Sequence, residues 1–197
     1  MANIIGIDLG TTYSAVATID DTGRPAIIHN EQGDNITPSC VVEDSPDVML
    51  VGEFARRQWG NAPDTAAARF KRDMGTSQTH SINGKEFSPT QLSTFVLKKL
   101  VSDAASSIGE IGETVVTIPA NFAHEARDAT MAAANSAGLD VKYIINEPTA
   151  AALYYAFKNE EELGGIYAVY DMGGGTFDVS IIRVDGQDVE VLATNGV

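Results

Sequence analysis

Residues 5–14 read Ile5-Gly6-Ile7-Asp8-Leu9-Gly10-Thr11-Thr12-Tyr13-Ser14, and a second stretch far along the chain follows the same plan. The second stretch reads Ala168-Val169-Tyr170-Asp171-Met172-Gly173-Gly174-Gly175-Thr176-Phe177-Asp178. In both, an apolar strand ends in aspartate and is followed by an apolar residue, glycine, threonine and an aromatic residue. A second run with strand-like alternation comes next, at 15–19 and at 179–184. The repeat predicts two copies of one strand–turn–strand unit.

The turns of this unit have the composition of a phosphate-binding site. Glycine lets the backbone approach a ligand without a Cβ atom, and backbone N–H groups in a tight turn form a concave site for phosphate oxygens. An aspartate at each strand end, Asp8 in one copy and Asp171 in the other, suits Mg²⁺ held directly or through water. Two such turns that face each other would hold the phosphates of a nucleotide from both sides.

The composition excludes some classes of partner. The formal net charge of −14 over 197 residues would repel a nucleic acid or an anionic membrane, whereas binding of a phosphate depends on local amides and cations. Cys40 is the single cysteine, so an internal disulfide is excluded and a reducing cytosol is the expected compartment. The sequence has no signal-like N-terminal region and no apolar run of bilayer length. We therefore expect a cytoplasmic protein of one or two domains, with no nucleic acid or membrane partner.

The pattern of the whole chain predicts an α/β fold in which the order βββαβα is followed by the start of a second βββ copy. Residues 30–88 are less regular, with short helices expected over 54–59 and 65–71 and a hairpin turn at Asn83-Gly84. The chain ends at Val197, where the helices of the second copy are expected, so we expect a truncated piece of a longer domain. The expected helices start at Ser88-Pro89, at 124 (ending at 137) and at Pro148. The expected strands cover 3–9, 13–19, 25–29, 114–118, 141–145, 177–184 and 189–194, with one more beginning at Ile166.

These residues resemble the nucleotide-binding domain of the seventy-kilodalton heat-shock chaperones, the DnaK family, within the actin/hexokinase superfamily. The resemblance covers essentially the whole chain. Actins and sugar kinases share the looser Asp–Gly–Thr plan, whereas the Glu-Pro-Thr-Ala-Ala-Ala run and the Gly-Gly-Gly-Thr-Phe-Asp turn are more specific to the chaperones. Besides the two glycine turns, the resemblance is carried by Lys71-Arg72, Met74-Gly75, Val116-Thr117-Ile118-Pro119-Ala120 and Asn146-Glu147-Pro148-Thr149-Ala150-Ala151-Ala152.

The resemblance implies an actin-like ATPase fold, which is related to ribonuclease H, with lobe I alone present in this chain. Subdomain IA would comprise residues 1–36 and 87–197, and subdomain IB would be the insertion 37–86. Lobe II and the peptide-binding domain would be absent. The insertion is short, as in Gram-positive-type members, so contacts of the missing segment, including part of a nucleotide-exchange-factor surface, are not expected. A second departure is Asn121, where members typically carry tyrosine.

The resemblance also implies the ligands, which are ATP or ADP with Mg²⁺, and K⁺ as a further ion. The side chains of Asp8, Asp171 and Asp178 would hold Mg²⁺, largely through water. The phosphates would be lined by both glycine turns, at Gly10, Thr11, Thr12 and Tyr13 in the first and at Gly173, Gly174, Gly175 and Thr176 in the second.

Catalytic roles are implied for Lys71, Glu147, Asp171 and Thr176. Lys71 would reach the γ-phosphate and the attacking water, where a cation neutralises charge that develops during phosphoryl transfer. Glu147 would position the attacking water and the waters on the metal, although its place before Pro148 also fits a carboxylate that interacts with a helix dipole. Thr176 would supply a hydroxyl on the γ-phosphate side.

The expected function is that of the ATPase domain of a DnaK-type chaperone, which drives cycles of binding and release of unfolded peptides. The partners of the full-length protein would be a J-domain cochaperone, a nucleotide-exchange factor and client peptides, and the fragment alone is expected to be inactive. Two alternatives remain open from the residues. The chain is an actin-like filament ATPase if it polymerises with ATP, or a small-molecule kinase if a substrate-binding aspartate lies in the interlobe cleft.

Overall fold

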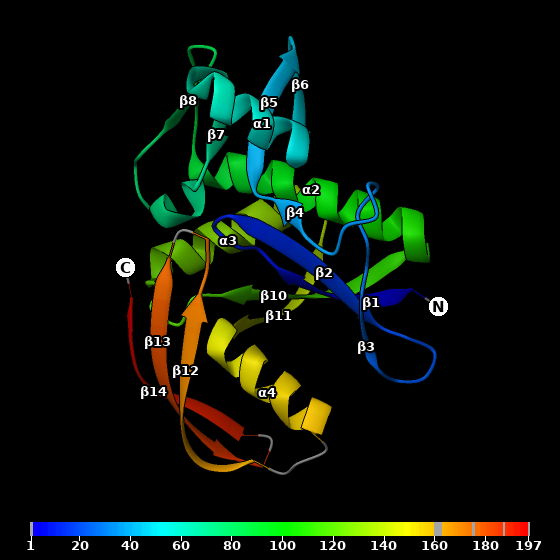
Figure 1. Ribbon diagram of the computed structural model, residues 1–197, viewed down its shortest axis with the longest axis vertical. Coiled ribbons are helices and arrows are strands. Elements are labelled where there is room, and N and C mark those ends of the chain that lie inside the picture. Colours follow the sequence, from blue (N-terminus) through cyan, green and yellow to red (C-terminus); the bar gives the residue numbers. More distant parts are fainter. Residues whose placement is uncertain (1, 160–162, 175, 187, 197) are drawn as a thin grey trace.

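The centre of the fold is a mixed β-sheet built from the first strand–turn–strand unit and two later strands (Figure 1). This computed structural model describes residues 2–159, 163–174, 176–186 and 188–196. Across the sheet, the strands are β11 (Asp140–Asn146), β10 (Ile111–Ile118), β1 (Asn3–Asp8), β2 (Tyr13–Ile19) and β3 (Pro25–Ile27). Strands β1, β10 and β11 run parallel, while β2 is antiparallel to both β1 and β3. All five predicted strands of this sheet are confirmed, although β10 begins at Ile111 rather than at 114.

Helices cover both faces of this sheet. On one face lie α2 (Pro89–Ile108) and α3 (His124–Ser136), and on the other lies α4 (Glu147–Asn159) (Figure 1). The predicted start of α2 at Ser88-Pro89 is confirmed. Ser88 is its N-cap, because the Ser88 hydroxyl accepts from the Gln91 N–H at 3.2 Å and the Gln91 side chain accepts from the Ser88 N–H at 2.8 Å.

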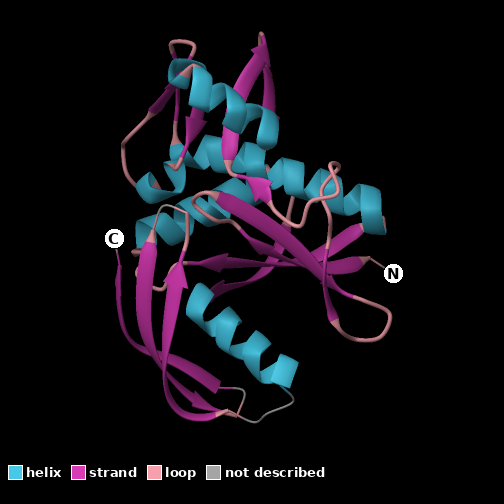
Figure 2. Cartoon of the chain, in the orientation of Figure 1, coloured by secondary structure: helices cyan, strands magenta, loops and turns pink. Residues whose placement is uncertain are grey.

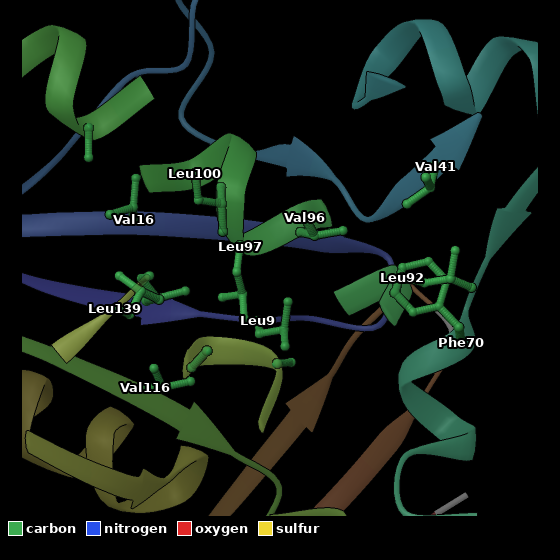
Figure 3. Packing of buried hydrophobic residues seen from close by; sticks show 14 of the residues in the cluster. Leu9, Val16, Val41, Phe70, Leu92, Val96, Leu97, Leu100, Val116 and Leu139 are labelled. Carbon is green, nitrogen blue, oxygen red and sulfur yellow. The ribbon is translucent and has the colours of Figure 1, made fainter. Parts of the chain in front are cut away.

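The core lies between α2, α3 and the sheet. Alternate residues of β1 point toward it, since Ile5 and Ile7 are buried while their neighbours face the other side. Helix α2 supplies buried apolar residues at helical spacing on one face. Figure 3 shows this packing, with Leu9, Val16, Val41, Phe70, Leu92, Val96, Leu97, Leu100, Val116 and Leu139 labelled. Burial of this cluster holds the end of β1, and hence the first glycine turn, in a fixed position.

The second strand–turn–strand unit forms a sheet of its own. Strands β12 (Gly164–Met172), β13 (Phe177–Asp185) and β14 (Asp188–Gly196) pair as an antiparallel meander, in the same order as β1, β2 and β3. Its small core cluster joins Leu163, Ile182 and Val184 to Ala152 of α4. The predicted repeat of three strands is confirmed, and α4 lies between the two sheets (Figure 1).

The insertion after β3 contains more strands than the sequence indicated (Figure 2). Strand β4 (Thr37–Pro38) pairs with β2, and α1 (Glu53–Asn61) contains the helix expected over 54–59. The Asn83-Gly84 turn is confirmed, with both residues at positive φ, between β8 (His80–Ile82) and β9 (Lys85–Phe87). A further sheet has the order β6-β5-β7 and consists of β6 (Val48–Val51), β5 (Cys40–Ser45) and β7 (Ala66–Ala68).

The helix expected over 65–71 is wrong. The three alanines of this stretch form β7 and pair with β5, between the 3₁₀ turns η1 (Pro63–Thr65) and η2 (Phe70–Asp73). Arg69 has a φ of 62°, a left-handed conformation that a continuing α-helix excludes. Pairing with β5 in the tertiary structure therefore outweighs the helix propensity of alanine. In the part of the chain that the structure describes, no helix has the length and apolar character needed to cross a bilayer.

Candidate functional site

The two glycine turns meet at a cleft of about 530 Å³. Their strands approach this cleft from different sheets, β1–β2 on one side and β12–β13 on the other (Figure 1). Gly175 lies outside the described residues, and every other predicted site residue lines the cleft. These residues are Asp8, Gly10, Thr11, Thr12, Tyr13, Lys71, Glu147, Asp171, Gly173, Gly174, Thr176 and Asp178.

The first glycine turn is held by a serine pair beneath it. The N–H of Gly10 donates to the Ser14 hydroxyl at 3.1 Å, and the Ser39 hydroxyl donates to the Gly10 carbonyl at 2.7 Å. The two serine hydroxyls are themselves 2.9 Å apart, and both side chains are buried. A Cβ atom on Gly10 would collide with the carbonyl oxygen of Tyr13, so the turn requires glycine at this position.

The second turn contacts the first at Gly174. A Cβ atom on Gly174 would lie 2.9 Å from three side-chain atoms of Thr12, so glycine is what permits the two turns to approach so closely. The hydroxyl of Thr12 is buried here and has no hydrogen-bond partner among the described residues. A buried hydroxyl without a partner is costly, and an acceptor such as a phosphate oxygen would satisfy it.

Substitution of Gly174 by alanine is expected to weaken nucleotide binding by roughly tenfold, about 1.4 kcal/mol, because overpacking against Thr12 typically costs about 1–3 kcal/mol. Gly164 provides a matched control, since a Cβ atom there meets nothing within 4 Å. Calorimetric titration of both variants with Mg·ADP measures the difference in their affinity for the nucleotide. Equal affinities for the two alanine variants would contradict the close contact of the turns.

Lys71 and Glu147 form a buried ion pair, and both residues line the cleft. The Lys71 Nζ donates to the Glu147 Oε1 at 2.7 Å, and the two side chains are only 7% and 15% exposed. Lys71 belongs to η2 of the insertion, whereas Glu147 is the first residue of α4, directly after β11. Burial raises the pKa of Glu147, the Lys71 ammonium opposes that rise, and the carboxylates of Asp8 and Asp171 add to it.

Three aspartates surround this pair. The Thr117 hydroxyl donates to Asp8 Oδ1 at 3.1 Å, and the Asn121 amide donates to Asp178 Oδ1 at 3.3 Å. Asp178 lies directly opposite Asp171 in the β12–β13 ladder. Burial, and then the neighbouring Asp171 carboxylate, raises the pKa of Asp178. Within residues 2–159 and the described parts of 163–196, no group of three or more His, Cys, Asp or Glu side chains is close enough to hold a metal by itself.

This donor set fits a hydrated Mg²⁺ bound together with phosphate. Mg²⁺ usually keeps several waters and is held by one or two carboxylates plus phosphate oxygens, which requires no complete protein cage. The described residues that line the cleft include several carboxylates and the Lys71 ammonium group. The Thr12 hydroxyl, which has no hydrogen-bond partner among the described residues, adds a hydrogen-bond donor for phosphate. Its chemistry therefore suits a phosphate–metal complex better than a bare ion.

Tyr13 faces two ways at the edge of the cleft. Its phenol oxygen accepts from Arg56 Nη1 at 2.7 Å, and Arg56 also donates to Glu53 at 3.0 Å, both residues lying in α1. The first turn is thereby tied to the insertion by a side-chain contact that the sequence did not predict. Arg56 had no distinguishing signal, because it is one of two adjacent arginines on a short helix that is largely exposed.

Other lining residues were not proposed as site residues from the sequence. The Lys71 ammonium lies 5.8 Å from the centre of the Phe122 ring, a cation–π contact at the cleft wall. Phe122 and Asn121 follow β10, and loops at the carboxyl ends of parallel strands are where ligand sites gather in α/β folds. That rule was a usable signal for these two residues. The remaining lining residues are Arg72, Pro119, Met172 and Gly196.

Comparison with models of protein families gives a match that spans almost the whole sequence. A family model described as "Hsp70 protein" matches residues 4–197. The match includes both glycine turns, the Lys71 turn and the strand end that carries Glu147.

Proposed function

Because the chain belongs to the Hsp70 family, which consists of chaperone ATPases with the actin-like fold, we propose that it forms the phosphate-binding part of a DnaK-type ATPase domain. The observation that carries this proposal is the cleft itself. Two glycine turns, one lysine and four carboxylates, distant in sequence, converge on one volume of about 530 Å³. Membership of this family disfavours both the filament protein and the small-molecule kinase.

The proposed roles divide the cleft into a binding part and a reacting part. The described residues of the two turns hold the phosphates. The Thr12 hydroxyl, which has no partner among the described residues, donates a hydrogen bond to a phosphate oxygen. Asp8, Asp171 and Asp178 would hold Mg²⁺ largely through water, and K⁺ is proposed as a further ion only from the family resemblance. Lys71 offsets charge on the transferring phosphoryl group, while the Glu147 carboxylate orients the attacking water.

We propose that ATP hydrolysis here drives cycles of binding and release of unfolded peptides, assisted by a J-domain cochaperone and a nucleotide-exchange factor, in the cytoplasm. The domain division stays a proposal as well, with an insertion at 37–86. The separate sheet formed by 164–196 favours counting those residues as a unit distinct from the first sheet, rather than as part of one subdomain with 1–36.

The direct test is a titration of the 197-residue chain with Mg·ADP, followed through backbone amide NMR signals. We expect shifts concentrated at residues 10–13 and 173–176, and much smaller shifts with adenosine, which has no phosphate.

Thr12→Val keeps the side-chain shape and removes the hydroxyl. Because hydrogen bonds to charged groups contribute roughly 1.5–3 kcal/mol, it is expected to weaken binding by about 10- to 100-fold. Shifts confined to surfaces outside the cleft would contradict the proposal.

A further inference from the structure

Asp73 and His80 make a contact beside the turn that carries Lys71. Asp73 Oδ2 and His80 Nε2 are 3.0 Å apart, and the two side chains are 28% and 22% exposed. Asp73 is the last residue of η2, and His80 is the first residue of β8. With its proton on Nε2, the imidazole donates to the carboxylate whether the ring is neutral or charged. The contact therefore joins the Lys71 turn to the β8–β9 hairpin.

The turn itself has little internal support. It is a 3₁₀ turn over 70–73, a type of helix with poorer hydrogen-bond geometry than an α-helix. It is entered through Arg69 in the left-handed region, a conformation that surrounding structure must hold in place. Contacts with neighbouring elements therefore determine the position of the Lys71 backbone, from which the side chain extends toward Glu147.

Neighbouring elements hold the other sides of this turn. Phe70 is buried in the core and meets the His80 ring edge-on at 6.2 Å between centroids. Met74 is buried and accepts from the Ser93 hydroxyl of α2 at 3.5 Å. Gly75, at a φ of +78°, lies against the first turn of α3, because a Cβ atom there would be 2.5 Å from the Ala126 nitrogen. Asp73–His80 supplies the polar link on the side that faces the hairpin.

We propose that Asp73 and His80 are a positioning pair that keeps the Lys71 ammonium within hydrogen-bond reach of Glu147. The Lys71–Glu147 bond is 2.7 Å long and joins two residues 76 positions apart, so it depends on where the insertion places η2. A displacement of about 1 Å is enough to cost roughly 10²-fold in a reaction that depends on such geometry. The consequence for catalysis rests on the proposed function, whereas the placement of Lys71 does not.

The test reads the Lys71 ammonium directly in the 197-residue chain. A lysine ammonium that is buried and hydrogen-bonded exchanges its protons slowly, so it gives a ¹H–¹⁵N signal at low temperature, and Lys71→Arg assigns that signal by removing it. We expect the signal in the wild type and in His80→Gln, whose amide N–H replaces the imidazole donor. We expect its loss in His80→Leu, which has no donor. Ser81→Ala, an exposed neighbour in the same strand, should leave the signal unchanged.

Asp73→Ala approaches the same contact from its more exposed partner and should also remove the signal, so the test does not depend on the fold of the His80→Leu variant. Retention of the Lys71 signal in either variant overturns the positioning role, as does its loss in His80→Gln. ATP turnover is measured in parallel with the full-length protein. His80→Leu is expected to lower kcat with little change in KM, and His80→Gln to restore it. If Lys71→Ala leaves turnover unchanged, the catalytic proposal fails, but the NMR result still decides the positioning proposal.

Discussion

Replacement of Lys71 by alanine is expected to lower ATP turnover by the full-length protein about 10²- to 10³-fold, the typical cost of removing one preorganised hydrogen-bond donor from an active site. Lys71 is the ammonium that lines the cleft, and its Nζ lies 2.7 Å from the Glu147 carboxylate. A charge fixed in a partly water-excluded site acts on the developing phosphoryl charge without reorganisation. Steady-state hydrolysis of Mg·ATP measures the effect.

Two further variants make this result specific. Lys142→Ala removes an exposed lysine that lies 3.6 Å from Glu113 and from Asp140, outside the cleft, so its turnover should stay normal. Thr176→Ala removes a cleft hydroxyl that is proposed to act on the γ-phosphate side, so it should lower turnover. Because it leaves no buried charge unpaired, the unfolding midpoint should change little. Near-normal turnover of Lys71→Ala would contradict the catalytic assignment of this lysine.

The repeated turns show how much of the site the residue pattern alone could predict. Local composition was sufficient for them, because glycine, threonine and a strand-ending aspartate act through backbone geometry within a few residues. The pairing of Asp171 with Asp178 across β12–β13 follows directly from such a hairpin. The pattern did not predict how close the two turns come, and a Cβ atom on Gly174 would lie 2.9 Å from the Thr12 side chain.

Lys71 and Glu147 show what the pattern could not predict. Each belongs to an ordinary local context, a short turn in one case and the start of a helix in the other. Their pairing depends on the tertiary placement of the insertion, and only the family resemblance pointed to both. The same limit applies to the Arg56–Tyr13 contact, which spans 43 positions and has no local signal.

The insertion was the least predictable part of the fold for a related reason. Its strands are short, and β7 consists of three alanines, which have a low intrinsic preference for strands. The partner strand β5, the buried Phe70 and the left-handed Arg69 determine the path of the chain here. Since η2 carries Lys71, this one unpredicted segment sets the position of a proposed catalytic group.

The 197-residue chain by itself is expected to bind ATP weakly, with a dissociation constant above about 1 µM, the value that corresponds to about 8.2 kcal/mol. Sites with good affinity for small molecules bury about 70–90% of the ligand surface, whereas the groups that line this cleft suit its phosphate end. Tyr13 and Phe122 are the two aromatic residues among the described lining residues. Both already have a cationic partner, because Arg56 donates to the Tyr13 phenol oxygen and the Lys71 ammonium lies 5.8 Å from the centre of the Phe122 ring.

Calorimetry of the purified chain with Mg·ATP and with Mg·ADP measures this affinity, and hydrolysis is expected to be negligible under the same conditions. The Gly164→Ala chain serves as a control for handling and stability, because this position has open space around it. Inorganic triphosphate is the informative comparison. If the phosphates supply most of the contacts, triphosphate with Mg²⁺ should bind about as well as Mg·ATP. Submicromolar affinity for Mg·ATP, combined with much weaker binding of triphosphate, would show that these 197 residues bind the adenosine as well. That result would contradict the prediction that the cleft binds only the phosphate end.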